Sequence, residues 1–150
     1  MLDEIVQIPG VVRAALTEGA AECASVAAAI RRARPRVVVI AARGTSDHAG
    51  VYARYLIESH LALPVVLAAS SLTTVYQESM GWSDALVVGI SQSGQAPDVA
   101  AVLAAARRGG ALTLAITNER GSPLASEAEH TLLCRAGPER AIAATKTYVA

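Results

Sequence analysis

The stretch Ala85-Leu86-Val87-Val88-Gly89-Ile90, which runs directly into Ser91-Gln92-Ser93-Gly94, decides the fold of this 150-residue chain. An unbroken apolar run of this length is typical of a strand buried on both faces, as in a parallel sheet. The polar loop that follows is succeeded by Pro97, which can occupy the first turn of a helix. A buried strand, a tight loop and a helix in this order predict a parallel α/β sheet.

Further apolar runs repeat the pattern on either side of this strand, at residues 37–41, 65–68, 111–116 and 131–133. Segments with helical spacing lie between them, the longer ones at 20–33, 52–59 and 99–108 and shorter ones at 71–80 and 122–128. Strands that alternate with helices imply right-handed crossovers. We therefore predict an α/β fold of three layers, a doubly wound five-stranded parallel sheet with strand order 2-1-3-4-5.

Apolar residues spaced three and four apart mark the side of each helix that we expect to face the core. In the segment 20–33 these residues are Cys23, Val26, Ile30 and Ala33. In the segment 52–59 they include Tyr52, Tyr55 and Leu56. The stripes predict helices that are packed against the sheet along one side.

The chain divides into an expected N-terminal helical arm, residues 1–33, and a single domain, residues 34–150. Pro9-Gly10 is expected to interrupt the arm, because proline breaks helical hydrogen bonding. Residues 141–150 read as a helix that stops without a capping signal. We therefore expect a truncated last helix and a second domain that lies outside this chain.

Composition excludes several classes of protein. Hydrophobic residues make up 53% of the chain and charged residues 17%, which is too apolar for intrinsic disorder. Thirteen basic and thirteen acidic residues cancel, so no basic surface points to nucleic acid. The start of the chain has no signal-peptide pattern and no run is long enough to span a membrane, so we expect a cytoplasmic protein. Its two cysteines, Cys23 and Cys134, are expected to be reduced core thiols.

Two polar loops follow neighbouring strands of the predicted sheet. The first strand runs into Gly44-Thr45-Ser46 and the third into Ser91-Gln92-Ser93-Gly94. Ligands of open α/β sheets bind at the carboxyl ends of the strands, and backbone N–H groups at helix starts favour a phosphate. Serine and threonine are also ordinary helix caps, so either loop alone leaves both interpretations open. The pair of loops at one edge favours an anion site.

Other chemistries lack their motifs. The glycine patterns of dinucleotide-binding and P-loop proteins are absent, so we expect no cofactor. Gly89-Ile90-Ser91-Gln92-Ser93 nearly matches the nucleophile elbow of serine hydrolases, but Ser93 replaces the second glycine and only His130 lies downstream. His48, His60 and His130 have no metal-ligand spacing, so no metal is expected.

Four segments in register resemble the SIS (sugar isomerase) domain family, which includes the isomerase half of glucosamine-6-phosphate synthase. They are residues 42–49, 89–98, 116–125 and 136–147. The resemblance implies a flavodoxin-like fold that binds a phosphorylated sugar and forms homodimers through its helices. It also implies that residues of the first and second loops bind the phosphate: Thr45, Ser46, Ser91, Gln92 and Ser93. Ala96 stands where the family has a further threonine.

The same resemblance places the sugar against Gly44, Ile142 and Ala144, with Ala144 in place of a family serine. Glu139 is the one carboxylate that the family pattern brings near the sugar, and we name it as a candidate catalytic residue. A carboxylate that begins the last helix explains Glu139 equally well.

The function implied is an aldose/ketose isomerase, aminotransferase or deaminase of amino-sugar 6-phosphates, in which this part holds the phosphate. The family's main catalytic groups lie in segments that this chain does not contain. The alternative is a non-catalytic sensor module of a transcriptional regulator. Residues 1–33 argue against it, because they contain no DNA-binding pattern. An inert dimerisation module is a third possibility.

Overall fold

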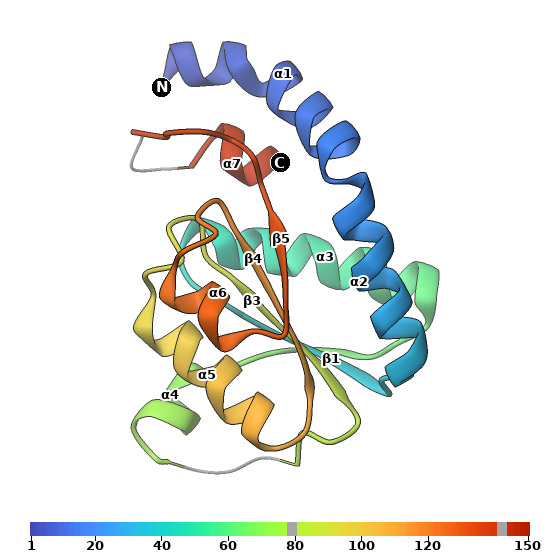
Figure 1. Ribbon diagram of the computed structural model, residues 1–150. Coiled ribbons are helices and arrows are strands. Elements are labelled where there is room, and N and C mark those ends of the chain that lie inside the picture. Colours follow the sequence, from blue (N-terminus) through green and yellow to red (C-terminus); the bar gives the residue numbers. More distant parts are fainter. Residues whose placement is uncertain (78–80, 141–143) are drawn as a thin grey trace.

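The computed structural model describes residues 1–77, 81–140 and 144–150, and in them five parallel strands form one sheet (Figure 1). The strands are β1 (Val37–Ala42), β2 (Val65–Leu67), β3 (Ala85–Ile90), β4 (Leu112–Thr117) and β5 (His130–Leu133). Their order is β2-β1-β3-β4-β5 and every pairing is parallel. The predicted strand order and fold class are confirmed.

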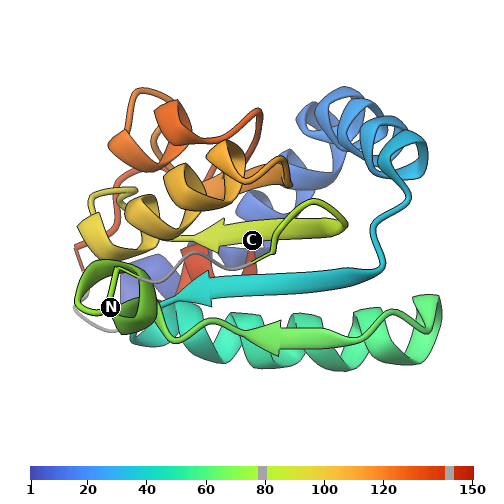
Figure 2. The same ribbon diagram turned by 90° about the horizontal axis from the view of Figure 1, so that it is seen from below.

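Helices cover both faces of this sheet. They are α1 (Leu2–Glu18), α2 (Ala20–Ala33), α3 (Thr45–Leu61), α4 (Ser70–Thr74), α5 (Pro97–Arg108), α6 (Pro123–Glu127) and α7 (Lys146–Val149). Figure 2 shows α5 on one side of β1 and β3 and α3 on the other. None of the helices in the described ranges is both long and apolar enough to pass through a membrane.

The alternation of side chains along the strands builds two separate cores. Val39 of β1 points to the α5 side, where it joins Leu103 and Leu124. Val38 points to the other side, where it joins Val26 of α2 and residues of α3. Both faces of the sheet are therefore buried, which explains why the strand sequences are continuous apolar runs. Through Val26, α2 takes part in this packing. The domain boundary expected at residue 33 stays a prediction.

The N-terminal helix does not break where the sequence predicted. Pro9 lies inside α1, which continues from Leu2 to Glu18. Pro9 is exposed, so water can satisfy the carbonyl group that loses its helical partner. The break between α1 and α2 falls at Gly19 instead.

The predicted core stripe of α3 is wrong. Tyr52 and Tyr55 are 64% and 72% exposed, whereas Ala53 and Ile57 pack against the sheet. Gly50 lies so close to Ile40 that an added Cβ would sit 3.1 Å from its Cγ2 atom. Small side chains let the helix approach the sheet closely, and this leaves the tyrosine side in solvent.

Two smaller expectations also change. Cys23 is exposed on α2, so only Cys134 is a buried core thiol, and both are free. In the described part of the helix expected over residues 141–150, α7 begins at Lys146 and Thr145 is its N-cap residue. Residues 141–143 lie outside the described part of the chain.

Gly89, next to the carboxyl end of β3, allows α5 and α6 to pack closely on the sheet. A Cβ at this position would lie 2.9 Å from Leu103 Cδ1 and 3.0 Å from Leu124 Cδ1. Both leucines are fully buried, so neither can move aside freely.

We predict that Gly89→Ala lowers the free energy of unfolding by about 1–3 kcal/mol through this overpacking. Urea unfolding measures the change. Gly121→Ala is the matched control, because nothing lies within 4 Å of its Cβ position, and its effect should stay within about 0.5 kcal/mol. Equal stability of the two variants would contradict the packing described.

Candidate functional site

The loops after β1 and β3 meet at one pocket. The two strands pair along their length up to Ala42 opposite Ile90, so their loops leave the sheet side by side. A pocket of about 200 Å³ lies there and is lined by Thr45 and Ser46 from the first loop and by Gln92 from the second. The structure therefore brings together three of the predicted phosphate-binding residues.

The second loop is tied firmly to the end of β4. The backbone carbonyl of Gln92 accepts hydrogen bonds from Asn118 N–H at 3.0 Å and from Thr117 Oγ1 at 3.2 Å. Ser91 N–H donates to the carbonyl of Ile116, and Gly94 N–H donates to the carbonyl of Ser91, both at 3.1 Å. These bonds fix the backbone of the loop before any ligand arrives.

Gly94 lets the same loop press against α6. Its φ is +63°, and a Cβ there would lie 2.1 Å from Ser122 Oγ. Its carbonyl accepts from Leu124 N–H at 3.1 Å, while Ser122 caps α6 by accepting from Ala125 N–H at 3.3 Å. No side chain other than hydrogen fits, so glycine is required at this point.

Several backbone donors remain available at this edge. Within the described residues, the N–H groups of Thr45, Gln92 and Ser93 have no hydrogen-bond partner. Thr45 begins α3, whose N-terminal dipole attracts negative charge. Across the rim, Arg43 Nη1 lies 3.4 Å from Asp98 Oδ1, an exposed ion pair that links the first loop to α5. Unpaired donors beside a helix start form a suitable environment for an anion.

The C-terminal segment and the sheet supply the other walls. Ala144, Thr147 and Tyr148 line the pocket from the end of the chain, and Ile90, Ile116 and Cys134 line it from the strands. Burial raises the pKa of the Cys134 thiol to about 11, so the thiol is neutral at pH 7. This part of the pocket is therefore mostly apolar and carries no charge on its cysteine.

Glu139 holds the C-terminal segment together. Its Oε1 atom accepts from Thr145 N–H and Thr145 Oγ1, both at 2.7 Å, and from Lys146 N–H at 2.9 Å. Burial raises the pKa of Glu139, but hydrogen bonds from Thr147, Thr145 and Lys146 outweigh it and leave the pKa lowered. Glu139 thus acts at the start of α7 and is not among the residues that line the pocket. Its catalytic role stays a prediction.

The remaining predicted residues lie around the pocket rather than in its lining. Ser91 is buried beneath the loop, and Ser93 is exposed with its Oγ accepting from Gln95 N–H at 3.3 Å. Gly44 occupies the N-cap position of α3, and Ala96 that of α5. Ala144 is the exception, since it is among the lining residues, and its contact with a sugar stays a prediction; Ile142 falls outside the described residues.

Sequence reasoning missed Cys134, Thr147 and Tyr148 as pocket residues. No spacing in the sequence marks Thr147 and Tyr148, because they lie in the short helix α7 while Ala144 precedes it. Cys134 has no local motif, because it reaches the pocket only through the pairing of β5 with β4.

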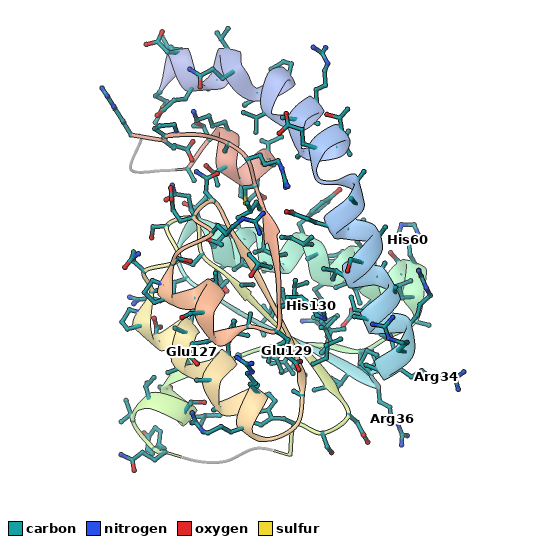
Figure 3. All side chains as sticks on the ribbon, viewed as in Figure 1. Arg34, Arg36, His60, Glu127, Glu129 and His130 are labelled. Carbon is teal, nitrogen blue, oxygen red and sulfur yellow. The ribbon has the colours of Figure 1, made fainter. Side chains whose placement is uncertain are left out.

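Ionisable residues gather elsewhere on the molecule. Figure 3 shows Glu129 and His130 together where β5 begins, and Arg34 and Arg36 beside the turn that leads into β1. His130 is separated from β3 by β4, and no described residue hydrogen-bonds to its ring. This placement gives no support to a serine–histidine pair with Ser91.

The family model of the SIS domain matches residues 29–150, which include both loops and the pocket. The chain belongs to the SIS domain family. Among curated proteins, the glutamine–fructose-6-phosphate aminotransferase (isomerizing) of Halobacterium salinarum is 49% identical over 112 residues. That match covers 73% of this chain but only 18% of the relative.

Solved structures of the family superpose closely. A putative phosphosugar isomerase from Silicibacter pomeroyi has a TM-score of 0.94 and 43% identity, over 97% of this chain and 45% of that one. The C-terminal domain of glucosamine-fructose-6-phosphate aminotransferase from Francisella tularensis has a TM-score of 0.85 and 27% identity, over 99% and 43%. This SIS domain therefore spans less than half of each of these relatives.

The lowered pKa of Glu139 predicts an acid-sensitive C-terminal segment. Its hydrogen bonds should be fully present above its ordinary pKa of 4.5 and should be lost as the pH falls through the lowered value. Hydrogen exchange at the Thr145 and Lys146 amides, corrected for intrinsic rates, should show protection that declines below pH 4.5. In Glu139→Gln this decline should disappear. Wild-type protection that is constant with pH would refute the prediction.

Proposed function

We propose that this SIS domain binds the phosphate group of an amino-sugar 6-phosphate, such as glucosamine 6-phosphate, or of fructose 6-phosphate. The observation that carries the proposal is the meeting of Thr45, Ser46 and Gln92 in one pocket, next to unpaired backbone donors of both loops. Hydroxyl, amide and backbone N–H groups are the donors that neutral phosphate sites use.

The end of the pocket that the two loops form suits the phosphate group of an ester. Its donors come from the start of α3 and from the loop after β3, whose backbone is already fixed through Gln92 and Gly94. A rigid set of donors loses little entropy on binding and does not need a lysine. Ser91 and Ser93 complete the predicted phosphate-binding set from the same loop.

The parent activity that we propose is interconversion of the aldose and ketose forms of the sugar phosphate, with amination or deamination as a variant. Such a reaction moves a proton between C1 and C2, and it requires a firmly oriented substrate. In this reaction, we assign to this chain the binding and orientation of the sugar phosphate. The main acid and base are expected from other segments of the full-length enzyme, with Glu139 as the candidate in this domain.

A non-catalytic sugar-phosphate sensor is the second candidate. It would use the same pocket, so the pocket does not distinguish the two functions. Two of the relatives reported above favour the enzyme, since one is named as an aminotransferase and the other as a phosphosugar isomerase. We further propose a homodimer formed through the SIS helices, for which the exposed stripe of Tyr52, Tyr55 and Leu56 on α3 is a suitable surface.

Substitution in the first loop tests the phosphate site. Ser46→Ala removes one donor of the pocket and should weaken binding of glucosamine 6-phosphate and fructose 6-phosphate about tenfold, since one hydrogen bond to a charged group is lost. Isothermal titration calorimetry measures the affinity. Ser59→Ala, on the same helix but with its hydroxyl bonded to the Tyr55 carbonyl, should bind like the unmodified protein.

A stronger variant replaces Ser91 and Ser93 together by alanine. If this double variant and the unmodified chain bind the two sugar phosphates equally, or if neither binds them, the proposed phosphate site is wrong. Thermal unfolding of each variant establishes that the fold is intact.

A further inference from the structure

The N-terminal helix α1 packs behind the part of the pocket wall that comes from the end of the chain. Val11 of α1 is 8% exposed and packs with Cys134 and Ala136, and Cys134 is one of the lining residues. Figure 1 shows α1 running beside α7, and the two helices are in contact. The match to the SIS family model begins only at residue 29. The pocket wall is therefore supported by a helix that the family match does not include.

Two polar residues of α1 contact the same part of the chain. Glu4 Oε1 accepts a hydrogen bond from Arg140 N–H, and Gln7 Oε1 accepts one from Lys146 Nζ at 2.7 Å. Glu4, Gln7 and Val11 are spaced three and four residues apart, which places them along one side of the helix. This side of α1 is thus attached at three points, through two hydrogen bonds and one apolar contact.

Lys146 connects this attachment to the pocket. The residue is only 3% exposed, and within the described ranges the Gln7 oxygen is the one hydrogen-bond acceptor of its ammonium group. Its backbone N–H donates to Glu139 Oε1 at 2.9 Å, so both ends of the residue are fixed. Thr147 and Tyr148, which follow it in α7, line the pocket. Since a buried ammonium without an acceptor is costly, loss of the Gln7 oxygen should draw Lys146 toward water and displace α7 with it.

The phosphate-binding groups depend on other contacts. Thr45 and Ser46 belong to the start of α3, and the loop that carries Gln92 is held by Thr117 and Asn118. The pocket extends from these loops to α7, so a phosphate held by the loops directs the rest of the ligand toward α7. Displacement of α7 should therefore weaken contacts with the sugar part of a ligand and leave those with the phosphate unchanged.

We propose that Gln7 is a positioning residue for the pocket: by holding Lys146, it keeps α7 in place against the sugar part of a bound sugar phosphate. The inference rests on the proposed function, because it requires a sugar phosphate in this pocket. It extends the set of residues that shape the site to α1. Apolar periodicity does not mark Gln7, since its partner lies 139 residues away in the chain.

The test compares Gln7→Met, which keeps the length of the side chain but removes the acceptor, with Gln7→Glu, which keeps the acceptor. Calorimetry should show that Gln7→Met binds glucosamine 6-phosphate and fructose 6-phosphate about fivefold more weakly than the unmodified protein. Gln7→Glu should bind within about twofold of it, because a carboxylate accepts from the same ammonium. Thr17→Ala is the matched control on α1, since its exposed hydroxyl bonds to the Arg13 carbonyl of the same helix.

Further measurements separate positioning from a general loss of structure. Inorganic phosphate, followed by NMR at the Ser46 and Gln92 amides, should bind Gln7→Met within about twofold of the unmodified protein, since the phosphate donors are untouched. Amide chemical shifts in α7 should change in Gln7→Met, whereas those of the buried strand β3 should not. The double variant Gln7→Met/Lys146→Met should regain most of the affinity, because it no longer buries an unpaired ammonium.

Each other outcome has a distinct meaning. If Gln7→Met and the unmodified protein bind both sugar phosphates equally, the role of Gln7 is wrong while the proposed phosphate site stands. If Gln7→Met weakens inorganic phosphate as much as the sugar phosphates, or if Gln7→Glu binds as weakly as Gln7→Met, the positioning role is overturned. If the unmodified protein binds neither sugar phosphate, the proposed function fails and this inference fails with it.

Discussion

The site depends on the hydrogen bonds and the close packing that hold the loop after β3, which we call the clamp. The Gln92 carbonyl accepts from both the backbone of Asn118 and the side chain of Thr117, which ties the loop to the end of β4. Gly94 then packs the loop against Ser122 at a distance that excludes any Cβ. Since the carbonyl groups of the loop are engaged inward, N–H groups of Gln92 and Ser93 remain for a ligand. The loop is pre-organised by these neighbours together with its own turn from Ser91 to Gly94.

Parallel pairing turns this local clamp into a pocket. Because β1 and β3 run in the same direction and in register, the start of α3 lies beside the clamped loop. The third wall comes from residues 144–150, which Glu139 orders through Thr145 and Lys146. Lys146 in turn donates to Gln7 Oε1 at 2.7 Å, so the N-terminal helix supports the same wall. Segments from both ends of the chain thus shape one site at the carboxyl edge of the sheet.

Local patterns predicted most of the fold. Continuous apolar runs located all five strands to within a residue or so, and Pro97 begins α5 as expected. Periodicity failed on α3, where two stripes are apolar enough to face the sheet. Periodicity alone does not show which side of α3 packs against the sheet, since that depends on the close approach of the helix at Gly50. The predicted break at Pro9 was wrong for a related reason, because a proline on the exposed side of a helix is tolerated.

The sequence by itself determined the sheet, its strand order and the two loops that carry Thr45, Ser46 and Gln92. These features depend on local composition and on the rule that parallel strands end at one edge. Only the tertiary structure decided that Glu139 caps the last segment, that Ser93 lies outside the pocket lining and that Cys134 and Thr147 lie within it. Those placements depend on contacts between residues far apart in the chain, for which no spacing of residue types is a guide.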